Sequence, residues 1–219
     1  MSELFGQKLL EFVERRPSNV SKVTVEKGDN LYNYGNRAGN IYLLESGLMK
    51  TVIYARDGKK CLLSIFTPGD SLGELSMFLP FCTETASAMK RSVVWQIPSC
   101  RFLDALADDT LVEGLIFHLA RRVAEQQQII ANLVTMDSER RLGVILLNLA
   151  RKLGRANGHK LLIDDRITQD DLSGMVGTTR SRVGFFLKRF RAAGLVECAP
   201  QAFLVVHEPS LAAFVEASA

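Results

Sequence analysis

The sequence predicts an α+β protein with an N-terminal β-roll of jelly-roll type, a long dimerisation helix and a C-terminal winged helix-turn-helix. Three observations predict this fold class. Glycines separate short β-type segments between residues 20 and 100, a heptad pattern follows from residue 109, and a basic amphipathic segment lies near the C-terminus. We place the three domains at residues 1–108, 109–136 and 137–219.

The first domain has the pattern of a small β protein. An amphipathic helix is expected at residues 4–14, and β-type runs follow at 41–44, 49–54, 61–66 and 93–97. The pair Asp57-Gly58 favours a tight hairpin, because glycine readily adopts the positive φ that such turns require. Short strands at this spacing are typical of a jelly roll or a barrel.

A coiled-coil seam marks the second domain, where apolar residues recur every four and three positions. Two copies of this helix are therefore expected to pair. The seam consists of Val112, Ile116, Leu119, Val123, Gln126, Ile130 and Leu133. The polar Gln126 can fix the register of the pair, or it can sense something bound beside the interface.

The third domain begins where Asp137-Ser138 can cap a new helix, which makes residues 136–138 a natural hinge. A strand is expected at 161–163, two short strands around 199–201, and a last helix at 209–217. Two helices joined by a glycine are expected between the strand at 161–163 and the two strands around 199–201. Thr168 and Asp171 can form a capping box for the first, Gly177 supplies the turn, and Thr178 or Thr179 caps the second.

The second of these helices is expected to enter the DNA major groove. From residue 178 to 191 the chain carries five basic residues and no acidic one, while its apolar residues share one helical face. Such a helix can also be only a solvated surface, but cap, turn, charge and apolar stripe together favour DNA. The expected DNA contacts are Thr168, Gln169, Thr178, Thr179, Arg180, Ser181, Arg182, Phe185, Lys188 and Arg189.

These contacts have different expected roles. Arg180 starts the helix and is the candidate for bidentate bonds to guanine O6 and N7. Arg182, Lys188 and Arg189 are expected on phosphates, and Phe185 can pack on a thymine methyl group.

Composition narrows the class of protein further. The formal net charge is only +3, so affinity for DNA must come from clustered charge. The chain has neither a run of about 18 apolar residues nor a secretory signal pattern, so we expect a cytoplasmic protein without a membrane partner. Four cysteines lie far apart without a CxxC pair, so we expect reduced thiols and no metal site.

An enzyme is not expected. A jelly-roll metal enzyme would need clustered histidines, but His118, His159 and His207 all lie outside residues 20–107. The motifs GxSxG, P-loop GK[ST] and HExxH are also missing from the sequence.

The chain resembles the CRP/FNR family of bacterial transcription regulators over almost its whole length. The resemblance rests on IYLLESG, PGDSLGELSMF at 68–78, LARRVAEQQ, RLGVILLNLARKLG and ITQDDLSGMVGTTRSRVGFFLKRF. It implies a β-roll that binds an effector, a long helix that dimerises, and a winged domain that binds a two-fold symmetric promoter site. The implied partners are double-stranded DNA, a second copy of the chain and RNA polymerase.

The implied effector pocket consists of Gly73, Glu74, Leu75, Glu84, Thr85, Gln126 and Gln127. Glu74 keeps the glutamate that contacts ribose in cyclic-nucleotide-binding members, although it can equally satisfy backbone amides in a tight turn. Glu84 stands where such members hold the cyclic phosphate with an arginine, and a carboxylate repels an anion. Gln126-Gln127 replaces their Thr-Ser pair. Both departures argue against cyclic AMP, and no cofactor is predicted.

Three kinds of control therefore remain open: gating by an unidentified effector, a constitutive DNA-binding dimer, and gating by redox change or haem. Cys82 and His118 are the conceivable sensors, but Cys82 has no basic neighbour in the sequence and a lone histidine is more often a packing residue. The iron–sulfur members carry clustered N-terminal cysteines, whereas none precedes Cys61 here. Ser181 and Phe185 depart from the best-known members, so we expect a different DNA sequence.

Overall fold

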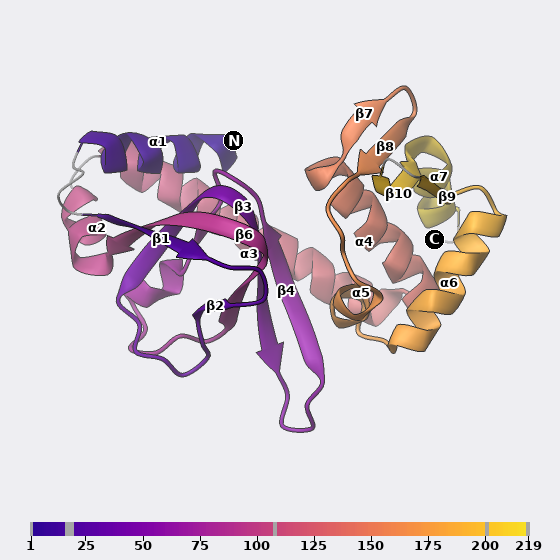
Figure 1. Ribbon diagram of the computed structural model, residues 1–219, viewed down its shortest axis with the longest axis horizontal. Helices are drawn as coiled ribbons and strands as arrows, with labels where there is room; N and C mark the ends of the chain where they lie inside the picture. The colour runs from indigo at the N-terminus through magenta and orange to yellow at the C-terminus, as the bar shows by residue number, and fades with distance from the viewer. Residues whose placement is uncertain (1, 16–19, 107–108, 200–201, 218–219) are drawn as a thin grey trace. The chain divides into compact units, whose positions relative to one another are not determined.

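The computed structural model describes residues 2–15, 20–106, 109–199 and 202–217, and it confirms the predicted α+β class (Figure 1). The chain forms two compact units, Met1–Gln126 and Gln127–Ala219. Their boundary divides the long helix, whereas the sequence analysis set domain boundaries at its two ends. Each unit is described by itself below.

The N-terminal unit is an antiparallel β-roll covered by helices. Helix α1 (Ser2–Arg15) comes first, and α2 (Ser99–Ala105) and the first part of α3 (Asp109–Thr135) follow the strands. The strands are β1 (Ser21–Val25), β2 (Asn30–Tyr32), β3 (Asn40–Tyr54), β4 (Lys60–Phe66), β5 (Ser71–Leu72) and β6 (Thr85–Pro98). The main path of the sheet is β1-β6-β3-β4, with β2 paired to β6 and β5 paired to β3. The 3-10 helix η2 (Glu74–Met77) follows β5.

Strand β3 is longer than expected, because the two runs predicted at 41–44 and 49–54 are one strand. Gly47 bends this strand without ending it. It has a φ of +106°, and a Cβ atom there would collide with Ser92 of β6. The pairing register between β3 and β6 shifts on both sides of residue 46. Glycine thus allows a close approach of two backbones at a bulge, as it does in other sheets.

Successive side chains of β3 point to opposite faces of the strand and belong to two different hydrophobic clusters. Ile41 and Leu43 face the helices and pack with residues such as Phe5 of α1 and Phe102 of α2. Tyr42 and Leu44 face the opposite side, inside the β-roll. Both faces are buried because side chains alternate across a strand and each face of this strand has a layer to pack against.

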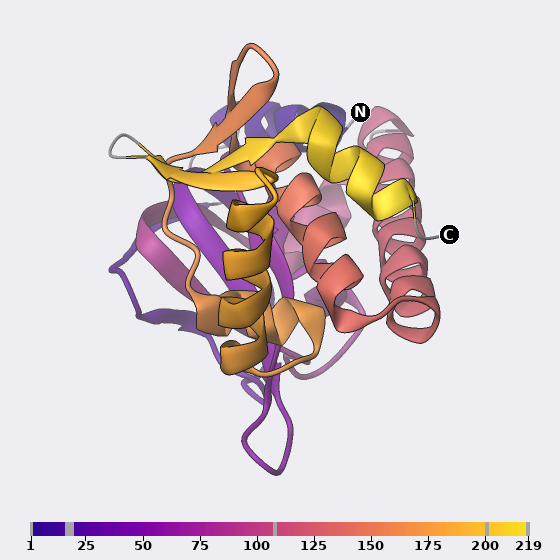
Figure 2. The ribbon, with the colours of Figure 1, turned by 90° about the vertical axis from the view of Figure 1, so that its right-hand side faces the viewer.

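The C-terminal unit contains the second part of α3, the helices α4 (Ser138–Leu153), α5 (Gln169–Val176), α6 (Arg180–Ala192) and α7 (Glu208–Glu216), and a sheet. The strands are β7 (Arg155–Asn157), β8 (Lys160–Ile163), β9 (Val196–Ala199) and β10 (Ala202–His207), in the order β7-β8-β10-β9. Figure 2 shows α6 with α5 beside its N-terminal end and the β9–β10 strands beside its C-terminal end. Neither β7 nor α2 was predicted from the sequence, and residues 200 and 201 of the expected short strands lie outside the described residues.

The end of α3 is tied to this unit by Arg141 of α4. Its guanidinium donates hydrogen bonds to the carbonyl oxygens of Met136, at 2.6 Å, and of Val176, at 3.0 Å. As predicted, Asp137 caps α4, since its side chain accepts hydrogen bonds from the backbone N–H groups of Glu139 and Arg140.

The described residues show no membrane-spanning helix, no cluster of metal ligands and no disulfide bond. None of their helices is long and apolar enough to span a bilayer. They contain no group of three or more acidic, histidine or cysteine side chains placed to hold a metal ion. All four cysteines are free thiols.

Candidate nucleic-acid interface and effector site

The first helix of the helix-turn-helix begins as predicted. The Thr168 hydroxyl accepts a hydrogen bond from the Asp171 backbone N–H at 3.0 Å, and the Asp171 carboxylate accepts one from the Thr168 backbone N–H at 3.4 Å. This reciprocal pair fixes the start of α5. Gly177 ends the helix in the left-handed conformation, with a φ of +71°, which turns the chain toward α6.

The second helix is capped by Thr179, one of the two residues considered. Its hydroxyl accepts a hydrogen bond from the Arg182 backbone N–H and lies 3.1 Å from the Ser181 hydroxyl. Thr178 lies in the turn, where its N–H donates to the Ser173 carbonyl. The hydroxyl of Thr179 therefore organises the helix start, next to Arg180.

One face of α6 is buried and the other carries the charge. The apolar stripe of Val183, Phe186, Leu187 and Phe190 is buried. On the opposite face Arg180, Ser181, Arg182, Phe185, Lys188 and Arg189 are exposed, and so is Gln169 of α5. Phe185 is 58 % exposed on this face, so its ring is accessible to a partner.

Arg189 differs from its neighbours because it is already paired. Its guanidinium lies 2.8 Å from the Glu139 carboxylate of α4. The other residues of this face expected on phosphates, Arg182 and Lys188, have no ion-pair partner among the described residues. The predicted phosphate contact of Arg189 therefore has to compete with an internal ion pair.

The predicted seam of α3 is largely open. Ile116, Val123, Ile130 and Leu133 are each between 45 % and 61 % exposed, Val112 and Leu119 are half-buried, and Gln126 is exposed. Large apolar side chains on one face of a helix lose hydration when a second helix covers them.

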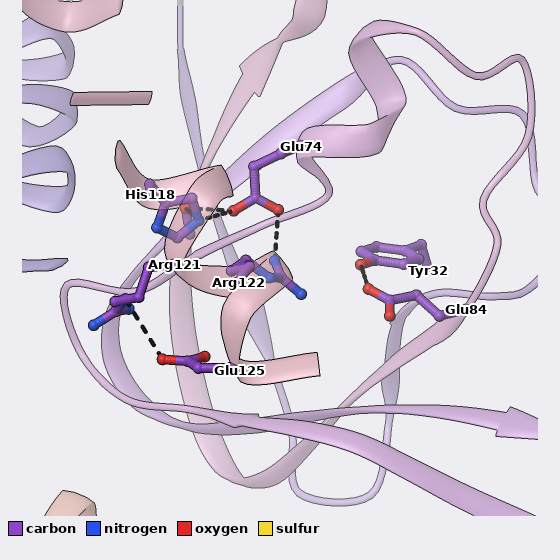
Figure 3. Close-up of polar contacts among 8 residues, drawn as sticks. Tyr32, Glu74, Glu84, His118, Arg121, Arg122 and Glu125 are labelled. Atoms are coloured by element: carbon purple, nitrogen blue, oxygen red, sulfur yellow. Dashed lines mark hydrogen bonds and ion pairs between the residues drawn. The ribbon is translucent and has the colours of Figure 1, made fainter. Parts of the chain in front are cut away.

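Glu74 of η2 sits in a buried polar cluster (Figure 3). One oxygen of its carboxylate accepts hydrogen bonds from Ser71, at 2.5 Å, and from His118 Nε2, at 3.0 Å. The other oxygen lies 3.0 Å from Arg122 Nη1. These partners are side chains, whereas the structural role considered for Glu74 involved backbone amides. The cluster joins η2 to α3.

The charge of Glu74 is stabilised by this cluster. Burial alone would raise the pKa of the Glu74 carboxyl. The hydrogen bond from His118, the charge of Arg122 and the hydrogen bond from Ser71 outweigh burial and lower the pKa to about 2. Glu74 is therefore ionised, and both of its carboxylate oxygens are already hydrogen-bonded to side chains of the protein.

Glu84 faces Tyr32, which donates its hydroxyl hydrogen to the carboxylate at 3.1 Å (Figure 3). Burial raises the pKa of Glu84, and the charge of Arg122 and the Tyr32 hydrogen bond offset this only in part. Burial and the nearby Glu84 also raise the pKa of Tyr32, so its hydroxyl stays protonated. Tyr32 in turn stacks on Tyr42, with ring centroids 5.6 Å apart. The guanidinium whose charge acts on Glu84, that of Arg122, is already bonded to Glu74.

The remaining predicted pocket residues have mixed surroundings. The Thr85 hydroxyl accepts a hydrogen bond from the Tyr34 backbone N–H, at 3.0 Å. Gly73 has a φ of +80° and starts η2, whereas Leu75 is 53 % exposed. Gln126 and Gln127 are exposed, and they fall in different units.

His118 and Cys82, the two residues considered as sensors, lie in surroundings that do not favour that role. His118 is buried, bonds to Glu74 and packs on Phe5, with ring centroids 5.0 Å apart. Burial and the charge of Glu84 raise the pKa of the Cys82 thiol, which opposes formation of the reactive thiolate.

Arg122 and Tyr32 were not among the predicted site residues, although Arg122 bonds to Glu74 and Tyr32 bonds to Glu84. Arg122 lies in the LARRVAEQQ motif, one helical turn after His118, and this i, i+4 spacing was the available signal. Nothing in the sequence around Tyr32 indicates its distant partner.

Comparison with known proteins agrees with both units. Residues 22–109 match the cyclic nucleotide-binding domain family, and residues 140–214 match the Crp-like helix-turn-helix domain family. The chain is 31 % identical to the CRP-like cAMP-activated global transcriptional regulator of Mycobacterium tuberculosis, over 88 % of this chain and 87 % of that protein.

Solved structures share the fold. FixK2 from Bradyrhizobium japonicum has a TM-score of 0.79 at 18 % identity, with coverage of 91 % of this chain and 98 % of that one. A CooA mutant from Carboxydothermus hydrogenoformans has a TM-score of 0.78 at 20 % identity, with 95 % of each chain covered.

The fold, the helix-turn-helix and these matches define a DNA-binding transcription regulator with a cyclic nucleotide-binding domain. The chain belongs to the CRP/FNR family, and the resemblance found in its sequence motifs is confirmed.

Proposed function

We propose that this regulator is a cytoplasmic, non-enzymatic homodimer that binds a two-fold symmetric promoter site through its two α6 helices and acts with RNA polymerase. The exposed face of α6 is the observation that carries the proposal. It presents basic residues and no acidic one, on a helix whose opposite face is buried and whose start is fixed by Thr179. A charged, rigid helix with a free face meets the requirements of major-groove binding.

Selection of bound DNA from a random pool tests this function. We expect a two-fold symmetric consensus with half-sites one helical turn apart, about 34 Å. An asymmetric consensus, or none, would contradict a symmetric dimer.

Dimerisation through α3 is supported by the exposed seam. Ile130→Asp is expected to shift the protein from dimer to monomer, because it puts a charge into an apolar contact that the partner must desolvate. Sedimentation velocity at micromolar concentration measures the change. Ala131→Asp is the matched control, since the adjacent position is exposed but lies outside the seam. Equal dissociation constants for both variants would contradict pairing through this face.

We propose that cyclic AMP is not the effector of this regulator. The Mycobacterium relative is named as cAMP-activated, but two features here oppose extending that ligand to this chain. Glu84 places a carboxyl group where the resemblance implies an arginine, and the acceptors of Glu74 are occupied by Ser71, His118 and Arg122. The cyclic phosphate would meet repulsion at Glu84, and the ribose hydroxyl would have to compete with Ser71, His118 and Arg122 for Glu74.

Glu84→Arg is expected to create measurable affinity for cyclic AMP. A guanidinium followed by the Thr85 hydroxyl offers charge-assisted hydrogen bonds, and such bonds contribute about 1.5–3 kcal/mol, or roughly 10- to 100-fold in affinity. Isothermal titration calorimetry measures the binding. Glu84→Gln is the control, because it removes the negative charge without supplying a donor fork. Tight binding of cyclic AMP by the wild type would contradict the proposal.

A constitutive DNA-binding dimer is the second candidate. It is favoured by the stack of Tyr32 on Tyr42 inside the β-roll, where side chains already occupy the interior. Tight, specific DNA binding by freshly purified protein without additives would support it, and binding that required an added ligand would exclude it. Redox gating is less favoured, since the pKa of Cys82 is raised.

A further inference from the structure

Phe185 lies in the middle of the exposed face of α6. It follows Ser181 by one helical turn and precedes Lys188 by one turn, so the three exposed side chains share that face. A phenyl ring has no hydrogen-bond donor or acceptor, so it cannot read a base through hydrogen bonds. The one apolar group that the four bases present in the major groove is the C5 methyl group of thymine. The chemistry of Phe185 therefore fits a methyl group on a base edge.

Two contacts hold the Phe185 ring although it is exposed. The ring of Phe186 meets it edge-on, with centroids 5.9 Å apart and an angle of 61° between the planes. On the next turn of the helix, the guanidinium carbon of Arg189 lies over the Phe185 ring, 6.0 Å from its centroid. A guanidinium over an aromatic face is attracted by the ring electrons. The contact therefore restricts the positions that the ring can take.

Arg189 is in turn held by Glu139, in the first turn of α4. Its guanidinium lies 2.8 Å from the Glu139 carboxylate, whose side chain is only 18 % exposed. The backbone N–H of Glu139 donates to the capping residue Asp137, at 2.8 Å, which fixes Glu139 at the helix start. A long arginine side chain loses rotamer freedom when it is held in one place, and a charge-assisted hydrogen bond offsets that loss. The contacts thus run from α4 through Arg189 to Phe185, all within one compact unit.

We propose that Glu139 and Arg189 are positioning residues that hold the Phe185 ring as a rigid apolar contact for the 5-methyl group of a pyrimidine. The inference rests on the proposed function, because α6 must lie in the major groove for the ring to reach a base edge. Thymine and 5-methylcytosine carry this methyl group on the same ring carbon, although their hydrogen-bonding edges differ. The regulator therefore distinguishes methylated from unmethylated cytosine at this position of its site, as it distinguishes thymine from uracil.

The test changes one pyrimidine at a time in both half-sites of the selected DNA. Fluorescence anisotropy compares duplexes that carry thymine, uracil, 5-methylcytosine or cytosine at that position. The methyl ratio is the affinity with the methyl group divided by the affinity without it, for each of the two pairs of bases. At one position we expect the wild type to have a methyl ratio of about fourfold per half-site in both pairs, as the burial of one methyl group predicts. A methyl ratio of one at every pyrimidine would overturn the proposal without any variant.

Three variants test the assigned residues. Phe185→Ala is expected to lower the methyl ratio to one, and Glu139→Ala and Arg189→Ala are expected to lower it toward one. Arg182→Ala is the matched control, because Arg182 lies over the neighbouring ring of Phe186, which is buried. This control is expected to weaken all duplexes alike and to keep the methyl ratio of the wild type.

The methyl ratio separates positioning from a merely structural role, since a general loss of affinity or stability cancels from it. An unchanged ratio in Phe185→Ala would overturn the methyl contact. An unchanged ratio in both Glu139→Ala and Arg189→Ala would overturn their role as positioning residues. Circular dichroism and thermal melting confirm that each variant is folded.

Failure of this inference is separable from failure of the proposed function. A two-fold symmetric consensus together with a methyl ratio of one would overturn the methyl contact alone. The absence of any selected consensus would overturn sequence-specific binding, and the methyl contact with it.

Discussion

Arg180→Ala is expected to weaken binding to the selected DNA site by about 1–3 kcal/mol and to relax the preference at one base pair of each half-site. Arg180 is the first residue of α6, its side chain is exposed, and Thr179 fixes the helix start beside it. A bidentate contact from this position is lost entirely when the side chain is cut back to a methyl group. Fluorescence anisotropy on the selected site, on single-base variants of it and on random duplex measures the effect.

Lys188→Ala is the comparison for this experiment. Lys188 is exposed on the same helix, two turns further on, and as a phosphate contact it is expected to weaken all sequences alike. The loss for Arg180→Ala is expected to be larger on the selected site than on random DNA. Equal losses on both would exclude base reading by Arg180.

Glu74→Gln is expected to lower the free energy of unfolding at pH 7 by about 3 kcal/mol. The pKa of Glu74 is lowered from 4.5 to about 2 in the folded state, and each pKa unit corresponds to about 1.4 kcal/mol. Because the folded-state pKa is the lower one, this stability is present above the unfolded pKa and is lost as pH falls toward 2. The neutral glutamine leaves Arg122 without its buried counter-charge.

Urea unfolding at several pH values between 7 and 2.5 measures this effect. The gap between wild type and variant is expected to close as the pH falls. Glu125→Gln is the control, since Glu125 pairs with Arg121 on the exposed surface of the same helix, where an ion pair contributes less than about 1 kcal/mol. A gap that did not change with pH would contradict the assigned role of the Glu74 charge.

Elements with local signals could be predicted from the sequence. The capping box joins Thr168 and Asp171, which are three positions apart, and the apolar stripe of α6 repeats within two turns, so neither depends on the rest of the fold. The prediction of two separate strands on either side of Gly47 was wrong, because the role of this glycine depends on a residue that is distant in the sequence. The glycine serves the close approach of Ser92, which lies 45 positions further along the chain.

The polar surroundings of the candidate sites could not be predicted, because they join distant segments. Glu74 meets His118 and Arg122 at separations of 44 and 48 residues, and Tyr32 meets Glu84 at 52. Arg189 pairs with Glu139, 50 residues away, which changes its expected availability for DNA. The local charge pattern predicts α6 as the DNA-binding element, but these pairings depend on tertiary packing.

Arg141 has a mechanical consequence for the second unit. Its planar guanidinium bonds to the carbonyl of Met136 just after α3 and to that of Val176 at the end of α5. A bend at residues 136–138 would have to stretch the bond to Met136, because Arg141 and Val176 both lie beyond that point in the chain. We therefore expect torsion in the last turn of α3 to reach α4 and the end of α5 through Arg141, and to turn the helix-turn-helix with them instead of being absorbed at residues 136–138.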